Sequence, residues 1–205
     1  MTGTESPHRR HGGTVSLNDH AHVVGFYEKD AHLVDFVRNF LVRGLLVGNA
    51  AVVVATDSHR ESFGGALVEA GIDVREIVQS GQFIVLDASQ TLSKFMVDGM
   101  PDPARFRTVM GELISRAAEG SRDVRIYGEM VAVLWDQGNV GAAIALEDLW
   151  NDLASRYSFS LYCAYPIRAF VAETSAEPFR KICGQHSRVT LVRSRWPGPA
   201  ASDER

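Results

Sequence analysis

The chain has few cysteines and no long apolar segment, and each absence excludes a class of protein. Two cysteines, Cys163 and Cys183, are too few for a disulfide framework and do not indicate an oxidising compartment. No apolar run approaches the roughly 20 residues needed to cross a bilayer. Residues 1–19 lack the apolar core of a signal peptide. We therefore expect a cytoplasmic protein without membrane contact.

Lysine is also scarce, and its positions exclude the usual phosphate-binding loop. The three lysines are Lys29, Lys94 and Lys181, and none follows a glycine. A P-loop needs G-x-x-x-x-G-K-[ST], because its lysine neutralises phosphate and its hydroxyl holds magnesium. The dinucleotide pattern G-x-G-x-x-G is absent as well. We expect no P-loop ATP hydrolysis and no cofactor, and we predict that the protein is not an enzyme.

The overall composition is that of a globular domain with no preference for nucleic acid. Of the 205 residues, 45% are hydrophobic and 22% are charged. The net charge of −4 argues against direct binding to a phosphate backbone, which requires a basic face. We predict a disordered leader over residues 1–19, one domain over 20–193 and a flexible tail over 194–205.

Within the domain, short apolar runs alternate with segments of helical periodicity. The helical stripes include Leu33–Leu45 and Phe106–Ala117, and further helices are predicted over 58–71, 91–99 and 139–156 and from Pro178. This alternation predicts an α/β fold with three layers, α/β/α, around a mainly parallel sheet. The predicted strands are His22–Tyr27, Ala50–Ala55, Phe83–Leu86, Val124–Tyr127, Phe159–Ala164 and Val189–Val192.

Polar and aromatic residues lie at or just beyond several of these strand ends. In parallel sheets, ligands bind outside the carboxyl ends of the strands. Tyr27, Thr56, Glu129 and Tyr165 fall there, and Glu129 could orient a ligand or simply cap a helix. We expect these residues, with His22, to line one small-molecule pocket.

Histidine and cysteine patterns leave metal and nucleophile alternatives open but weak. His20-x-His22 would place two imidazoles on one face of a strand. Cys183-x-x-His186 would place a thiol and an imidazole one helical turn apart, with Cys163 as a third ligand that nothing in the sequence positions. Because no complete ligand set or oxyanion motif accompanies them, hydrogen-bonded histidines are favoured. We predict no metal site and no catalytic residues.

Six short motifs in a fixed order resemble one known family. The resemblance extends over about His20–Leu191 and is specific through the number and order of the motifs. The matching segments are HVVGFY at His22–Tyr27, FMVDGMPD at Phe95–Asp102, YGEMV at Tyr127–Val131, LEDLWN at Leu146–Asn151, LYCAYP at Leu161–Pro166 and IC-x-x-HS at Ile182–Ser187. Together they resemble the MEDS family, named for a sensory domain of methanogens and methylotrophs.

The resemblance implies a fold related to RecA- and KaiC-type ATPases but without a P-loop, and a role in sensing small ligands. It implies output through a histidine kinase, an anti-sigma-type protein or a transcription regulator. Because no kinase or helix-turn-helix region is evident, the chain resembles a stand-alone sensory domain. The motif positions matching candidate ligand-binding residues are His22, Tyr27, Glu129, Tyr165 and His186.

We therefore expect a regulatory domain that binds a small, partly apolar ligand and relays the signal to such a partner. One alternative is a protein-interaction module that keeps the fold without any ligand. The third is an enzyme that uses Glu129 or the Cys183/His186 pair.

Overall fold

The apolar runs of the sequence form one parallel sheet in the computed structural model, which describes residues 21–170 and 176–192. The predicted leader, the tail and His20 lie outside these residues. The strands of the sheet are β1 (His22–Tyr27), β2 (Ala50–Ala55), β3 (Phe83–Asp87), β6 (Val124–Gly128), β7 (Ser160–Pro166) and β8 (Arg188–Val192). Their order is β3-β2-β6-β7-β1-β8, and every neighbouring pair is parallel.

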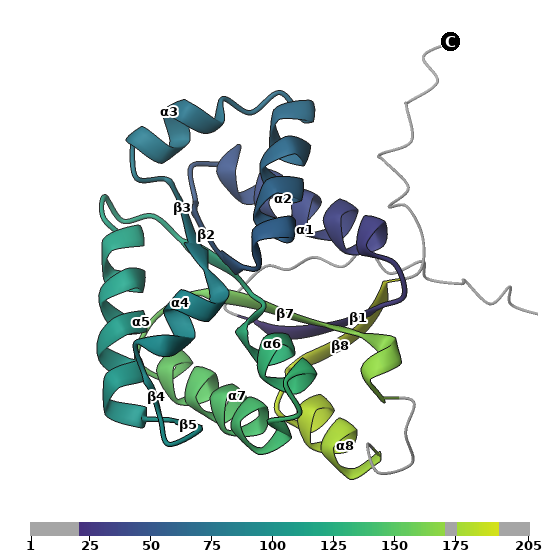
Figure 1. Cartoon of the computed structure of the whole chain (residues 1–205). Helices are drawn as coiled ribbons and strands as arrows, with labels where there is room; N and C mark the ends of the chain where they lie inside the picture. Colours follow the sequence, from purple (N-terminus) through teal and green to yellow (C-terminus); the bar gives the residue numbers. More distant parts are fainter. Residues whose placement is uncertain (1–20, 171–175, 193–205) are drawn as a thin grey trace, which may run out of the picture.

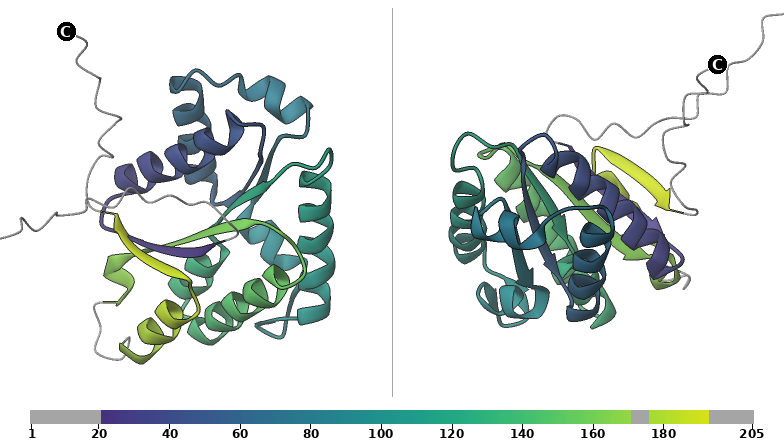
Figure 2. Two further views of the ribbon diagram at one scale, coloured as in Figure 1. Left: turned by 180° about the vertical axis from the view of Figure 1, so that it is seen from behind. Right: turned by 90° about the horizontal axis from the view of Figure 1, so that it is seen from above.

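Helices cover both faces of this sheet, so the predicted three-layer α/β/α fold is confirmed (Figures 1 and 2). One face carries α1 (Asp30–Leu45), α2 (Asp57–Glu69) and α3 (Val74–Gln79). The other face carries α4 (Ala88–Ser93), α5 (Pro103–Ala117), α6 (Met130–Asp136), α7 (Val140–Ala154) and α8 (Ala176–Gly184). A short 3-10 helix, η1 (Ile167–Phe170), follows β7.

Alternation along the strands divides the core between the two faces. In β1, Val23 and Tyr27 pack towards α1, whereas Val24 and Phe26 pack towards the opposite helices. All residues of β2 are buried, because this strand lies inside the sheet with helices above and below it. The chain therefore builds two apolar cores separated by one sheet.

The predicted helix from Thr91 to Gly99 is wrong in both its limits. The helix α4 begins at Ala88, because the Asp87 carboxylate accepts a hydrogen bond from the Gln90 backbone N–H and caps it. Beyond it, β4 (Met96–Val97) and β5 (Met100–Pro101) form a small antiparallel hairpin. Its two turn residues, Asp98 and Gly99, both have positive φ angles, as a tight Asp-Gly turn requires.

Two short helices were not predicted, and the last helix starts earlier than expected. The unpredicted helices are α3 and α6, and α6 begins immediately after Glu129. The helix α8 begins at Ala176 rather than at Pro178, so the proline lies within its first turn. Because α6 turns away directly at the end of β6, it positions Glu129 at the carboxyl edge of the sheet.

Candidate functional site

Two adjacent strands send the chain to opposite faces of the sheet, which is where α/β domains commonly bind ligands. The strands are β2 and β6, which pair in parallel. After β2 the chain enters α2 on one face, and after β6 it enters α6 on the other. Thr56 and Glu129 occupy the first position beyond each strand, so they meet at this edge.

The Glu129 carboxylate is held at this edge by three donors. Its Oε2 accepts hydrogen bonds from the Thr56 backbone N–H at 2.8 Å and the Thr56 hydroxyl at 3.1 Å. Its Oε1 lies 2.6 Å from His59 Nδ1. Glu129 and His59 are both buried, at 6% and 9% exposure. We call Thr56, His59 and Glu129 the carboxyl-edge cluster.

The hydrogen bond between Glu129 and His59 changes the proton affinity of the imidazole. That bond raises the pKa of His59 above its usual value, and it outweighs burial, which lowers the pKa. Tyr27, at the end of β1, belongs to the same electrostatic environment. Burial and then the charge of Glu129 raise the pKa of the Tyr27 phenol, so the phenol stays protonated.

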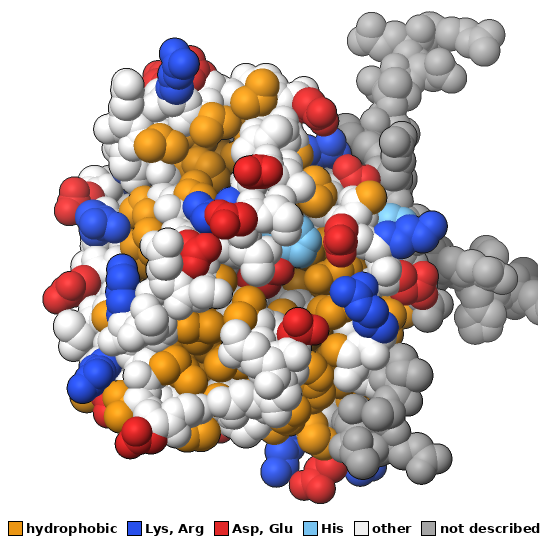
Figure 3. Space-filling view, viewed as in Figure 1, with side chains coloured by type: hydrophobic (Ala, Val, Ile, Leu, Met, Phe, Trp, Pro, Cys, Tyr) orange, Lys and Arg blue, Asp and Glu red, His pale blue; other side chains and the backbone are white. Residues whose placement is uncertain are grey.

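Further acidic side chains surround this edge. Arg60 donates to the carboxylates of Asp57 and Asp87, the latter at 3.2 Å. Asp30, at the start of α1, also raises the pKa of His59. Figure 3 shows acidic side chains and a histidine gathered between α2 and α6. The edge is therefore more favourable for donors and cations than for anions.

A groove opens next to this cluster, between the first turn of α1 and α2. Its volume is about 460 Å³, within the range of small-molecule sites. Its walls combine carboxylates, a hydroxyl and short apolar side chains. The lining residues are Asp30, Ala31, His32, Val34, Asp35 and Ser62.

A second polar group lies inside the core on the other face of the sheet. His22 from β1 and Cys163 from β7 point to this face, because each is in phase with the core residues of its strand. Glu147 comes from α7, and His186 follows α8. The exposed fractions are 7%, 0%, 0% and 9% for His22, Glu147, Cys163 and His186. We call these four residues the buried cluster.

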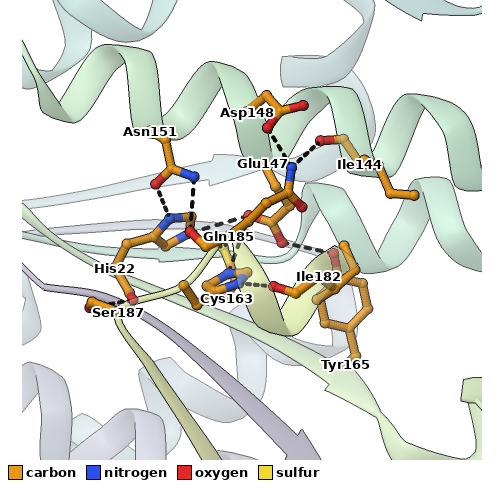
Figure 4. Close-up of polar contacts among 11 residues, drawn as sticks. His22, Ile144, Glu147, Asp148, Asn151, Cys163, Tyr165, Ile182, Gln185 and Ser187 are labelled. Carbon is orange, nitrogen blue, oxygen red and sulfur yellow. Dashed lines mark hydrogen bonds and ion pairs between the residues drawn. The ribbon is translucent and has the colours of Figure 1, made fainter. Parts of the chain in front are cut away.

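The four side chains converge on one small volume, and Figure 4 labels three of them, His22, Glu147 and Cys163. Glu147 Oε2 lies 3.2 Å from His22 Nε2 and 3.4 Å from His186 Nε2. Cys163 Sγ lies 3.6 Å from both His22 Nε2 and Glu147 Oε2. The four potential ligand atoms all lie within 4.8 Å of one another, so they could share one metal ion.

Surrounding groups fix the orientation of these side chains. His186 Nδ1 donates to the carbonyl oxygen of Ile182 at 2.6 Å. His22 Nδ1 lies 2.9 Å from Asn151 Oδ1, while Asn151 Nδ2 donates to the Gln185 carbonyl oxygen. The amide orientation therefore makes His22 Nδ1 a donor too. The remaining nitrogen of each imidazole, Nε2, faces Glu147.

Proton affinities in the buried cluster depend on burial and on these close contacts. Burial opposes ionisation of Glu147, whereas protonated His186 and His22 beside it would lower its pKa to about 2. Burial and then Glu147 raise the pKa of the Cys163 thiol. The Tyr165 hydroxyl donates to Glu147 Oε1 at 2.8 Å, and burial raises the pKa of this phenol.

The structure divides the predicted ligand-binding residues into two groups. Thr56 and Glu129 meet at the carboxyl edge, where Tyr27 also ends its strand. His22, Tyr165 and His186 belong to the core or contact the buried cluster. Since His22 begins β1 and Glu129 follows the end of β6, these positions lie at opposite ends of parallel strands. The single pocket lined by all of them is therefore not the arrangement found.

The Cys183/His186 pair, which the sequence left open as a metal or nucleophile alternative, differs from the contacts observed. The imidazole of His186 contacts Ile182 and Glu147, and its backbone N–H donates to the Cys183 carbonyl oxygen. Cys163, the third ligand that the sequence could not position, lies in the buried cluster instead.

Sequence reasoning missed Glu147, His59 and Asn151. Glu147 had a recognisable pattern, because it falls on the buried stripe of α7 with Ala143 and Trp150, four residues before it and three after it. An unpaired acid in such a stripe is costly, so a partner was to be expected. His59 and Asn151 had no comparable pattern, since their partners are distant in the sequence.

The fold and these clusters define an α/β domain with a polar carboxyl edge, polar groups in its core and no P-loop sequence. None of the helices in the part that the structure describes is long and apolar enough to cross a membrane. A family model described as MEDS, the methanogen/methylotroph, DcmR sensory domain, matches residues 21–181. The chain therefore belongs to the MEDS family of sensory domains. A search of curated proteins found no significant match.

Proposed function

We propose that this sensory domain binds a small, partly apolar ligand at the carboxyl-edge cluster and signals through the two helices that begin there. The observation that carries the proposal is the contact between Glu129 and the start of α2. The Glu129 carboxylate accepts the Thr56 backbone N–H at 2.8 Å. This N–H lies at the helix terminus where a phosphate would bind in a nucleotide-binding fold.

The charge of this edge favours ligands other than nucleotides. The chain's own carboxylate already occupies the anion-binding position at α2, and Asp30, Asp57 and Asp87 lie near it. A bound phosphate would meet like charges without a lysine to neutralise it. We therefore favour an uncharged or cationic molecule, and we propose that the domain does not hydrolyse nucleotides.

The groove between α1 and α2 matches a partly apolar ligand. Ala31 and Val34 supply apolar contact, while Ser62 and the carboxylates of Asp30 and Asp35 accept hydrogen bonds. The groove is also close to the cluster, because Asp30 lines it and acts electrostatically on His59. A ligand seated there can change the charge that acts on His59 and so the contact between His59 and Glu129.

Signal output follows from the position of Glu129 between two helices. Glu129 is the N-cap residue of α6, and its carboxylate binds Thr56, the N-cap residue of α2. A ligand that breaks or strengthens this contact shifts the position of α2 relative to α6. It does so only by as much as its affinity differs between the two arrangements. We propose that a histidine kinase, an anti-sigma-type protein or a transcription regulator recognises that change.

A ligand screen tests the site directly. Thermal-shift measurements would compare uncharged and cationic organic compounds with ATP and magnesium on wild-type protein, Glu129→Gln and Glu69→Gln. Glu69 is an exposed glutamate at the far end of α2, which makes its variant a matched control. We expect stabilisation of the wild type and the control by an organic ligand, weakened in Glu129→Gln.

Three outcomes would contradict the proposal. Stabilisation by ATP together with turnover that Glu129→Gln abolishes would indicate an enzyme. Binding of an organic ligand that is unchanged in Glu129→Gln would place the ligand elsewhere. A partner protein that binds wild type and Glu129→Ala equally, with no compound stabilising either, would indicate an interaction module without a ligand.

A further inference from the structure

The buried cluster leaves one imidazole nitrogen, His186 Nε2, without a hydrogen-bond donor when both rings are neutral, whereas the Cys163 thiol can donate to His22 Nε2. Both histidines donate their Nδ1 protons outward, to Asn151 and Ile182. In a neutral imidazole the other nitrogen, Nε2, then carries a lone pair. Both lone pairs face one oxygen of Glu147, which is itself an acceptor. His186 Nε2 is buried and has no hydrogen-bond partner among the described residues.

An extra proton on both rings at once is unfavourable. Protonated rings would donate to Glu147, but the ring centroids of His22 and His186 are only 4.0 Å apart. Two imidazolium charges at that distance repel each other, and two cations beside one carboxylate leave a net charge in the core. An uncompensated buried charge is strongly destabilising.

A divalent cation resolves both difficulties at once. It accepts the two imidazole lone pairs and one oxygen of Glu147. It also favours the thiolate of Cys163, because coordination deprotonates a thiol. One carboxylate and one thiolate then balance the charge of a dication, leaving the buried site neutral.

Four of the six distances among the ligand atoms match tetrahedral coordination. Zinc bonds of about 2.0–2.3 Å to nitrogen, oxygen and sulfur place neighbouring ligand atoms about 3.3–3.6 Å apart in a tetrahedron. Four of the six distances among the ligand atoms of the buried cluster run from 3.2 to 3.6 Å, and all six are within 4.8 Å.

We propose that His22, Glu147, Cys163 and His186 bind one divalent transition-metal ion, for which zinc is the best match. Two imidazoles, one thiolate and one carboxylate form a donor set of borderline softness, which suits zinc better than the oxygen-binding magnesium or calcium. This inference is independent of the ligand proposed at the carboxyl edge.

The site has the character of a closed, structural centre. Four protein side chains complete a tetrahedron and leave no position for water or substrate, as in structural zinc sites. The ligands come from β1, β7, α7 and the segment between α8 and β8. The ion therefore fixes the end of α8 and the edge strand β8 to the sheet.

Three neighbouring groups act as positioning residues rather than ligands. Asn151 and the Ile182 carbonyl oxygen hold the two imidazoles with Nε2 directed inward. The Tyr165 hydroxyl donates to Glu147 Oε1, which leaves Oε2 for the ion. Removing such a contact in other metal sites lowers metal affinity about 10–100-fold. We expect a loss of this size for Tyr165→Phe, with the ion still bound.

The first experiment is elemental analysis of the purified chain after dialysis. We expect one zinc ion per chain in wild type and in Cys183→Ser, and loss of the ion in Cys163→Ser. Cys183 is the matched control, because it is the only other cysteine and lies outside the four-residue group. Circular dichroism on each sample shows whether the variant is folded.

Cobalt substitution tests the same site without relying on a fragile variant. The chain, stripped of metal and reloaded with Co²⁺, should show a thiolate-to-cobalt absorption band and the intense visible bands of a tetrahedral ion. The thiolate band should persist in Cys183→Ser and in Tyr165→Phe. Chelator competition on these two proteins then gives the predicted drop in affinity for Tyr165→Phe alone.

Two results would overturn the proposal. The first is folded wild-type protein that contains no stoichiometric transition metal and takes up neither Zn²⁺ nor Co²⁺. The second is a cobalt complex whose thiolate band disappears in Cys183→Ser and remains in Cys163→Ser. Either outcome leaves the four residues as a hydrogen-bonded polar group in the core.

Discussion

The two glutamates at the centres of the two clusters are both buried, yet their surroundings are opposite. Glu129 at the carboxyl edge is surrounded by donors, since a backbone N–H, a hydroxyl and an imidazole N–H all point at it. Glu147 faces one phenolic donor, one thiol and the inward nitrogens of two imidazoles. The Glu129 carboxylate receives all its hydrogen bonds from its own chain, so a ligand can replace one of these donors. A carboxylate that shares its space with other acceptors suits a cation.

Replacing each glutamate by alanine is expected to give the largest difference between the two regions. Glu147→Ala leaves two buried imidazoles and the Tyr165 hydroxyl without their shared partner, at a cost of about 3–5 kcal/mol. Glu129→Ala frees donors that lie closer to solvent, at a cost of about 1–3 kcal/mol. Urea denaturation measures both free energies of unfolding. Equal losses of unfolding free energy in the two variants would contradict the stated difference between the surroundings of Glu147 and Glu129.

Removal of metal is expected to affect only one of the two regions. If the ion is present at about 100–1,000 times its dissociation constant, it adds about 3–4 kcal/mol to the stability of the folded state. A strong chelator should therefore lower the melting temperature of wild type and of Glu129→Gln. It should leave Cys163→Ser unchanged. A chelator effect of the same size in Cys163→Ser would contradict the assignment of that thiol.

The pH dependence of stability should report the carboxyl-edge cluster through His59. Its pKa is raised in the folded state above the usual value of 6.5, so the folded protein binds this proton more tightly than the unfolded chain. The stabilisation is complete below about pH 6.5 and is lost as the pH rises through the raised pKa. As a hydrogen bond to a charged group it amounts to about 1.5–3 kcal/mol.

The substitution His59→Gln should flatten this pH profile. Denaturation midpoints between pH 5 and pH 9 measure the effect. If the stability of the wild type rose with pH over this range, the stabilisation assigned to protonated His59 would be contradicted.

The smallest expected effect is that of a single hydroxyl at the carboxyl edge. Thr56→Val keeps the shape of the side chain and the backbone N–H but loses the bond to Glu129, at a cost of about 0.5–1.5 kcal/mol. Thr108→Val is the control, because its hydroxyl donates to the Ala104 carbonyl oxygen on the solvent-exposed side of α5. Ligand affinity should change in Thr56→Val and not in Thr108→Val.

Local patterns predicted the secondary structure well where burial was uniform. The run Ala50–Ala55 is apolar throughout because β2 is covered on both faces, and the structure gives it those bounds. The periodic stripe from Phe106 to Ala117 also predicted α5, because these residues lie on the one side of the helix that is buried. The hairpin after α4 was missed although Asp98–Gly99 is a strong turn pattern. A strand of two residues is too short to show any alternation.

The candidate site was less predictable, because it depends on the order of strands in the sheet. Thr56 and Glu129 were expected at strand ends, but only the β2–β6 pairing brings them together. Likewise, His22 and Cys163 meet because β1 and β7 are neighbours, although 140 positions separate the two residues. Local sequence patterns contain no information about such long-range pairing, so a one-pocket prediction joined residues that belong to two places.

The position of β1 in the sheet also has a consequence for how the protein folds during its synthesis. This strand is synthesised first, yet in the sheet it lies between β7 and β8, the last two strands of the described chain. During translation it must wait, with its apolar side chains uncovered, until more than a hundred further residues have left the ribosome. Long-range parallel pairing of this kind folds slowly and exposes intermediates to aggregation. Chaperone dependence and late acquisition of protease resistance on the ribosome are the behaviours to expect from this order of strands.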